Sequence, residues 1–198
     1  MSVLIAVVIG YLLGSVSFSY IIAKKVAGID IRQHGSGNAG ATNTLRVLGK
    51  GPGILVLLLD AGKGILAVLA AQWISGSDLA MALAGVAAIL GHNWPIFFGF
   101  RGGKGIATAI GVIATLSFFA FIWAVLATVL VIFLTRYVSL GSLVFLTLMP
   151  ILMYFHDDPL SFIMIALIVA ILGYVRHREN IVRLIQGKEN KLGSSKPM

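Results

Sequence analysis

The chain has 198 residues, of which 59% are hydrophobic and 11% are charged, and it carries a formal net charge of +8 and no cysteine. Soluble domains carry about 25% charged residues, so this composition excludes an ordinary water-soluble protein and predicts an integral membrane protein. The apolar runs do not alternate with polar residues as barrel strands would, so the predicted fold is all-α. The lack of cysteine excludes disulfides and thiol catalysis.

The first apolar run, residues 3–23, is uncharged and is followed directly by Lys24 and Lys25. A cleaved signal peptide would carry its positive charge before the apolar run, so we interpret this segment as a membrane span. A polar stretch then leads to two more apolar runs, 53–73 and 79–98.

Residues 105–134 fit two interpretations. Their length gives one helix of about 45 Å or two shorter crossings, 105–115 and 119–134. With two crossings, every Lys and Arg lies on one side of the membrane or, like Lys63, within reach of it. Basic loops are typical of the cytoplasmic side, so the charge pattern favours two crossings.

The chain is therefore predicted to be a single domain, 1–198, with seven transmembrane helices. The predicted spans are residues 3–23, 53–73, 79–98, 105–115, 119–134, 140–154 and 160–175. The N-terminus is predicted to lie outside, and the polar tail, 176–198, in the cytoplasm. The spans of about 15 residues are short for a hydrocarbon core of about 30 Å, so local thinning of the bilayer is expected.

This topology gathers the glycine-rich, basic segments of the chain on the cytoplasmic face. They are HGSGNAGATNTLR (34–46), GHNWPIFFGFRGGKGIAT (91–108), TRYVSLGSL (135–143) and RHRENIVRL (176–184). Glycines let backbone N–H groups approach an anion, and a helix that begins just after a loop, as at Gly105, points its positive end toward it. Positive charge comes from Arg46, Arg101, Lys104 and Arg178. The ligand predicted by this chemistry is phosphate, and more than one phosphate group is expected.

Two better-known nucleotide motifs do not apply. Gly35, Gly37 and Gly40 spell G-x-G-x-x-G, but a dinucleotide fingerprint needs a preceding strand within a βαβ unit, and none is predicted. A Walker A loop fails because Lys104 is followed by glycine instead of Ser or Thr. The cytoplasmic side also lacks clustered carboxylates, so neither a metal nor a cofactor is predicted.

For several single residues, the sequence allows two interpretations. Asp60 and Lys63 share a face inside a predicted span, where charges are either functional or form a structural ion pair. His92 either caps a helix end or acts in the site. His177 lies among basic residues, so it is either functional or part of a basic girdle that reaches toward the membrane surface.

Together these segments resemble the bacterial acyl-phosphate:glycerol-3-phosphate acyltransferase family of small integral membrane enzymes. The matching text is GSGNAGATNTLR (35–46), DAGKG (60–64), GHNWPIFFGFRGGKGIAT (91–108), SLGS (139–142) and RHRENIxRL (176–184), and it spans nearly the whole chain. The resemblance implies transfer of a fatty acyl group from acyl phosphate to sn-glycerol 3-phosphate. The products would be 1-acylglycerol 3-phosphate (lysophosphatidic acid) and phosphate, made during phospholipid synthesis at the bacterial inner membrane.

Both implied substrates carry phosphate, so we predict two groups of binding residues. The catalytic group, predicted to hold one phosphate and to stabilise the oxyanion of the tetrahedral intermediate, is Lys104, Ser142, His177 and Asn180. The residues predicted to bind substrate phosphate are Ser36, Gly37, Asn38, Gly40, Thr42, Asn43, Arg46, Arg101, Gly102, Gly103 and Gly141. The general base is either His177 or an oxygen of the substrate phosphate.

The acyl chain is expected in a groove between helices. The predicted partners are therefore acyl phosphate, glycerol 3-phosphate and membrane lipids, with no nucleic acid and no obligate protein partner. The main alternative is a membrane transporter for an organic phosphate. Transporters usually bind their substrates near the bilayer midplane and contain internal repeats, whereas the polar residues of this chain are predicted to lie on one face of the membrane.

Overall fold

The computed structural model describes residues 1–193, and within that range the chain is helical and contains no strand. The α-helices are α1 (Ser2–Gly14), α2 (Phe18–Ala27), α3 (Ala41–Leu48), α4 (Lys50–Ser75), α5 (Asp78–Asn93), α6 (Ile106–Leu116), α7 (Phe118–Thr135), α8 (Val138–Phe155), α9 (Leu160–Arg176) and α10 (Arg178–Ile185), with 3₁₀ turns η1 (Ile31–Gln33) and η2 (Ile96–Phe98). The prediction of an all-α fold is confirmed, and the last five residues of the predicted tail lie outside the described residues.

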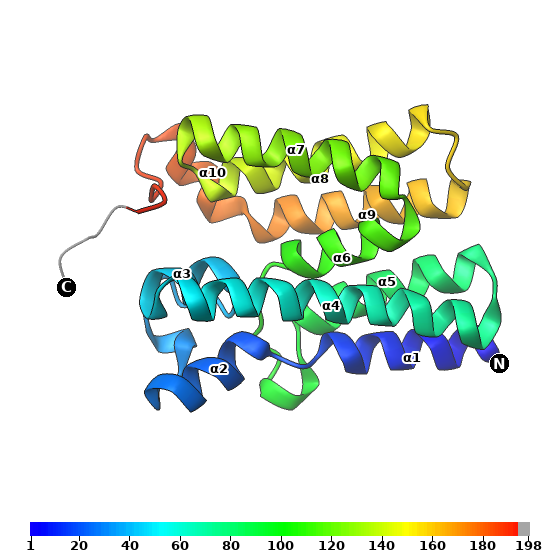
Figure 1. The fold of residues 1–198 in the computed structure, drawn as a ribbon, viewed down its shortest axis with the longest axis horizontal. Coiled ribbons are helices and arrows are strands. Elements are labelled where there is room, and N and C mark those ends of the chain that lie inside the picture. The colour runs from blue at the N-terminus through cyan, green and yellow to red at the C-terminus, as the bar shows by residue number, and fades with distance from the viewer. Residues whose placement is uncertain (194–198) are drawn as a thin grey trace.

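The long helices form two layers (Figure 1). Helices α1, α4 and α5 pack together in one layer, and α7, α8 and α9 form the other. The short helix α6 lies between the layers, where it contacts both α4 and α7, while α9 packs directly on α5.

Glycines allow helix backbones to approach closely inside the α1–α4–α5 layer and where α6 packs on it. A Cβ on Gly14 would collide with the carbonyl of Ala88 where α1 crosses α5. In the same way, a Cβ on Gly111 of α6 would collide with the carbonyl of Ala61 of α4. Small residues at helix crossings are typical of proteins inside lipid, where close van der Waals packing holds helices together.

The outer faces of the helices carry large apolar side chains. Leu58 of α4 is 63% exposed, Phe133 of α7 79% and Ile171 of α9 65%. Five helical stretches are long and apolar enough to cross a membrane, or six if the bent pair α9 and α10 is one span, and α6 is shorter. Such surfaces would associate in water, so the molecule is an integral membrane protein. The count of seven crossings stays a prediction.

Breaks in the helices depart from the expected spans in two places, and a third break lies between the predicted crossings 105–115 and 119–134. The segment predicted to begin at residue 3 and end at residue 23 is interrupted between α1 and α2, where the Lys63 ammonium donates to the carbonyl of Val16. Helix α5 ends before Pro95, which cannot continue the hydrogen-bond ladder. Between α6 and α7 the chain turns at Ser117, whose hydroxyl accepts from the backbone N–H of Ala120.

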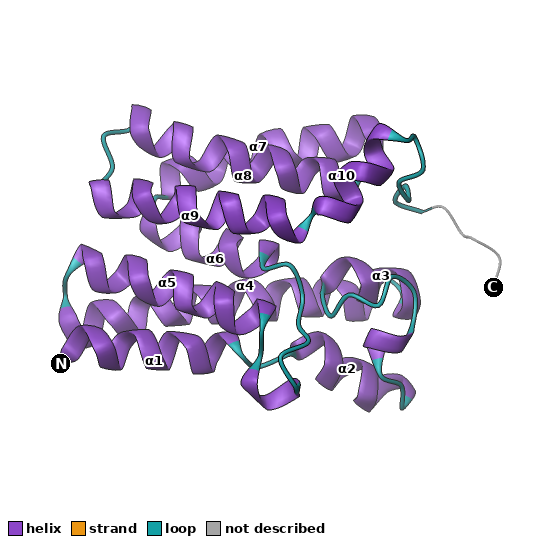
Figure 2. Ribbon diagram, turned by 180° about the vertical axis from the view of Figure 1, so that it is seen from behind, coloured by secondary structure: helices purple, strands orange, loops and turns teal. Residues whose placement is uncertain are grey.

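The two ends of the bundle differ in chemistry. Figures 1 and 2 show α2, α3 and α10 at one end, which we call the polar end, the N-terminus at the other end, and the chain entering α6 between them. The α4–α5, α6–α7 and α8–α9 turns lie with the N-terminus. Three of the four glycine-rich, basic segments thus lie at the polar end, and Lys104 of the fourth reaches α10 there, far from Asp78, Asp157 and Asp158.

Candidate functional site

The loop of residues 34–46, which we call the first loop, is organised by Asn43. This side chain is 1% exposed at the start of α3. Its Oδ1 accepts from the Ser36 backbone N–H at 2.8 Å, and its Nδ2 donates to the carbonyls of His34 at 2.9 Å and Ile31 at 3.2 Å. Because the whole amide is engaged by the backbone, Asn43 holds the loop in shape and does not present a free donor to a ligand.

The remaining predicted residues of the first loop range from exposed to buried. Gly37 has a φ of +72°, in the left-handed region that favours glycine, and Ser36 and Arg46 are exposed. Gly40 begins α3 without a side-chain cap, which leaves the N–H groups of that turn, including Thr42, available to an anion. Asn38 is half-buried beside Gly40.

The glycines of the second segment bring it against the end of α5. The Gly102 N–H donates to the carbonyl of Asn93 at 3.2 Å, and the Gly103 N–H donates to that of His92 at 3.1 Å. A Cβ on Gly103 would collide with the His92 ring. The two glycines therefore position the loop before α6, and their N–H groups are engaged by protein. Arg101, one residue earlier, is exposed.

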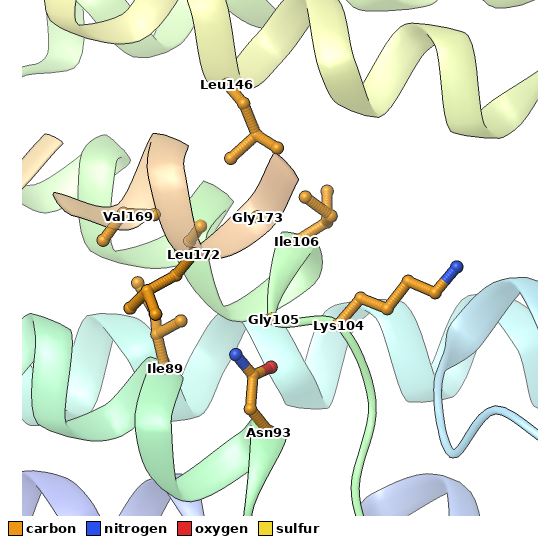
Figure 3. Close-up of a pocket in the computed structure, with 10 residues that line it drawn as sticks. Ile89, Asn93, Lys104, Gly105, Ile106, Leu146, Val169, Leu172 and Gly173 are labelled. Carbon is orange, nitrogen blue, oxygen red and sulfur yellow. The ribbon is translucent and has the colours of Figure 1, made fainter. Parts of the chain in front are cut away.

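Lys104 follows directly and reaches α10. Its ammonium donates to Oδ1 of Asn180, which is 8% exposed. Burial, together with the positive charge of Arg183, lowers the pKa of Lys104 to about 8. Figure 3 shows its side chain pointing away from the apolar residues near Gly105, toward the polar end of the molecule. Lys104 is thus a partly desolvated cation that is still mostly protonated near neutral pH.

His177 sits at the bend of 61° between α9 and α10. It is 3% exposed, and its Nδ1 lies 2.7 Å from the carbonyl oxygen of Gly173. A carbonyl can only accept, so Nδ1 carries the proton. Burial and the nearby Lys104 charge lower the pKa of His177 to about 4. The imidazole is therefore neutral at pH 7 and a weak base.

Two predicted site residues on α8, Ser142 and Gly141, contact residues of α7 and α8. Ser142 is 6% exposed, and its hydroxyl donates to the carbonyl of Val138 at 2.9 Å. Gly141 lies where a Cβ would collide with Ile132 of α7, and its carbonyl accepts from Thr128 at 3.3 Å. Among the described residues, no hydrogen bond joins either one to Lys104 or Asn180.

Glu189 is not among the residues predicted from the sequence, and the fold places it next to Asn180. Its carboxylate accepts from Ser139, Asn180 and Arg183. We call Lys104, His177, Asn180 and Arg183 the Lys104 group, and Glu189 bonds to two of its members. The available signal was weak: Glu189 is the single acidic residue after Glu179 in an otherwise basic tail.

Asp60, Lys63 and His92 form a buried network next to this group. The Lys63 ammonium lies 2.8 Å from Oδ1 of Asp60 and 3.0 Å from Nδ1 of His92, and the three side chains are 1%, 3% and 7% exposed. The network ties α4 to α5 and to the α1–α2 break. Since the His92 ring also touches Gly103, this ion pair supports the loop that carries Lys104.

A small, mostly apolar pocket lies below Lys104 (Figure 3). Ile89, Leu146 and Val169 form part of its wall. Asn93 points toward Gly105 there, and its side-chain nitrogen and oxygen are buried without a hydrogen-bond partner. Within residues 1–193, no group of three His, Asp or Glu side chains is arranged to hold a metal ion.

Comparisons with known proteins identify the family of the chain. The profile of the family described as Glycerol-3-phosphate acyltransferase matches residues 4–187. The chain is similar to the glycerol-3-phosphate acyltransferase of Shouchella clausii (strain KSM-K16), with 60% identity over 97% of each protein. Its counterpart in Halalkalibacterium halodurans is 57% identical over 94% of this chain and 93% of that protein.

Two solved structures are also similar, both of PlsY (YgiH), an integral membrane glycerol 3-phosphate acyltransferase. The glycerol 3-phosphate form superposes with a TM-score of 0.92 and the lysophosphatidic acid form with 0.90. Each is 40% identical and covers 98% of this chain and 96% of its own. These findings confirm the family resemblance drawn from the motifs. The chain belongs to the glycerol-3-phosphate acyltransferase family of integral membrane proteins.

Proposed function

We propose that this enzyme transfers a fatty acyl group from acyl phosphate to a hydroxyl of sn-glycerol 3-phosphate, at the polar end of the bundle. The observation that carries the proposal is the convergence of Lys104 and Asn180 from segments far apart in the chain, next to the exposed donors of the first loop. Together they form two neighbouring groups of anion-binding residues. A substrate pair in which both members carry phosphate fits that arrangement.

In this mechanism the attacking hydroxyl oxygen forms a bond to the carbonyl carbon of acyl phosphate. The carbon–oxygen bond to phosphate then breaks, and phosphate leaves with the bonding electron pair. Negative charge develops on the carbonyl oxygen in between. The Lys104 ammonium and the Asn180 amide are the groups placed to bind phosphate and to stabilise that charge.

The proton of the attacking hydroxyl needs an acceptor, and two candidates follow from the sequence. With a pKa of about 4, His177 is a poor base. A phosphate monoester has a second pKa near 6 and is the stronger base of the two. We therefore favour a phosphate oxygen of the substrate as the acceptor, with His177 orienting the α9–α10 junction.

For the membrane we propose seven crossings in the bacterial inner membrane, with the polar end in the cytoplasm. Support comes from the basic residues at the polar end and from Asp78, Asp157 and Asp158 at the other. Helix α6 is about 16 Å long, so the bilayer must thin around it or other helices must cover its ends. A reporter fused after Met198 should be active only inside the cell, and activity only outside would contradict this orientation.

The reaction is tested with purified protein in detergent. We expect labelled glycerol 3-phosphate and acyl phosphate to give a labelled lipid, with release of phosphate. A parallel reaction with an acyl thioester as donor tests the choice of acyl phosphate. Lipid formed only from the thioester would contradict the proposed donor, and no lipid from either donor would favour a transporter or a structural protein.

A further inference from the structure

The carboxylate of Glu189 is surrounded by hydrogen-bond donors at the polar end. Its Oε1 accepts from the Ser139 hydroxyl at 3.1 Å and from Nδ2 of Asn180 at 2.7 Å, and its Oε2 accepts from Nε of Arg183 at 2.7 Å. The side chain is 6% exposed. Burial alone would raise the pKa of Glu189, but the bonds from Arg183 and Asn180 hold it below its usual value. The group is therefore an anion held by three donors.

One of the three donors to this anion, Asn180, belongs to the proposed substrate site. Asn180 bonds Glu189 through one side-chain atom and Lys104 through the other. Carboxylate and phosphate oxygens use the same donors, and charge-assisted bonds of this kind are strong. A substrate phosphate placed beside Lys104 would meet a second negative charge on the same amide. Repulsion between the two negative charges disfavours the presence of both.

Residues 186–193, which carry Glu189 and which we call the strap, are held by hydrogen bonds on both sides of Glu189. On one side the Lys188 N–H donates to the carbonyl of Arg183 at 2.8 Å. On the other, the Leu192 N–H donates to the carbonyl of Arg136 at 2.7 Å, and the Arg136 guanidinium donates back to the carbonyl of Leu192. The bonds from the Arg136 guanidinium are exposed to solvent, so the strap can open there without unfolding α10.

We infer that Glu189 is an internal competitor for substrate phosphate: its carboxylate occupies Asn180, Arg183 and Ser139 in the resting enzyme, and a phosphate-bearing substrate must displace it to bind. This inference rests on the proposed function, since it names the residues that the substrate phosphate takes over. Binding to a site that is open for a fraction of the time is weakened by that fraction. Removing the competitor therefore tightens binding and leaves the chemical step intact.

The test compares Glu189→Gln with the unchanged protein in steady-state assays that vary each substrate separately. We expect the KM of one phosphate-bearing substrate to fall by about threefold or more, which corresponds to a strap closed for roughly two thirds of the time or longer, with kcat unchanged. Inhibition by inorganic phosphate should strengthen in parallel. Asp157→Asn is the matched control, because it removes the same charge at the opposite end, at a left-handed position that asparagine tolerates.

A second variant, Arg136→Gly, loosens the strap and keeps Glu189. Arg136 ends α7 with a φ of +64°, where glycine is favoured, so the helix should remain intact. Loss of a positive charge alone would raise the KM for an anion, whereas release of the strap lowers it. A lower KM therefore supports the strap, and an unchanged or higher KM contradicts it. This variant also provides the test if Glu189→Gln proves unstable in thermal unfolding.

An unchanged or raised KM in Glu189→Gln overturns the inference and would make Glu189 a group that organises Asn180 and Arg183. Failure of the proposed function would look different. In that case the unchanged protein itself forms no lipid, and stabilisation of the purified protein by glycerol 3-phosphate in thermal unfolding, which needs no acyl donor, would be absent as well.

Discussion

The first loop and the Lys104 group both lie at the polar end of the bundle, yet they are built in different ways. In the first loop, Asn43 bonds backbone groups within 12 residues of itself, so the loop shapes itself locally. The Lys104 group is assembled from the α9–α10 junction, α10 and the loop before α6, and its central contact joins residues 76 positions apart. A local loop can present backbone donors, whereas the long-range group depends on the packing of both layers.

The largest expected effect comes from removing the charge of the Lys104 group. Lys104→Ala should lower kcat/KM about 10²- to 10³-fold, the usual loss of one donor to a developing oxyanion. Steady-state kinetics on purified protein measures this loss, with Lys50→Ala as the control because Lys50 is exposed at the same end of the molecule. Near-normal activity of Lys104→Ala would remove Lys104 from the mechanism.

The next effect concerns the shape of the first loop. Asn43→Ala removes three hydrogen bonds; the two carbonyls keep other backbone donors, and the Ser36 N–H loses its partner. Each lost bond costs about 0.5–1.5 kcal/mol. We expect the KM of one substrate to rise about tenfold or more, as the ordered loop becomes a minor state. Gln33→Ala, an exposed change just before the loop, serves as the control. Equal kinetics for both variants would show that the loop needs no internal scaffold.

A smaller effect is expected from pH. The pKa of Lys104 is lowered to about 8, so its positive charge is present below that pH and is lost as the pH rises through it. The profile of kcat/KM should therefore fall on the alkaline side of about pH 8, and Lys104→Arg should shift that fall to higher pH because a guanidinium keeps its proton. An alkaline fall that stays in place in Lys104→Arg would assign it to another group.

The smallest effect is expected from the exposed cation of the first loop. Arg46→Ala should raise the KM of one substrate a few-fold, and the difference should shrink as salt is added, because solvent screens exposed charges. The same assay on Lys25→Ala, an exposed change on α2, checks for a general effect of net charge. A loss that persists at high salt would indicate a direct, desolvated contact.

The same difference between local and long-range contacts explains what the sequence could predict. The turn at Ser117 agrees with a charge pattern that is visible in the sequence, and the clustering of the four polar segments follows from it. The break between α1 and α2 had no such signal, because Val16 accepts from Lys63 of another helix. Glu189 was missed for the same reason: its donors lie on α8 and α10, and no spacing in the tail indicates them.

The central claim is that the first loop and the Lys104 group hold different phosphates. The most direct test measures the KM of acyl phosphate and of glycerol 3-phosphate separately in Asn43→Ala and in Asn180→Ala. We predict a crossed result, in which each variant raises the KM of one substrate and leaves the other nearly unchanged. If both variants raise the same KM and spare the other, the two groups bind a single phosphate and the account is wrong.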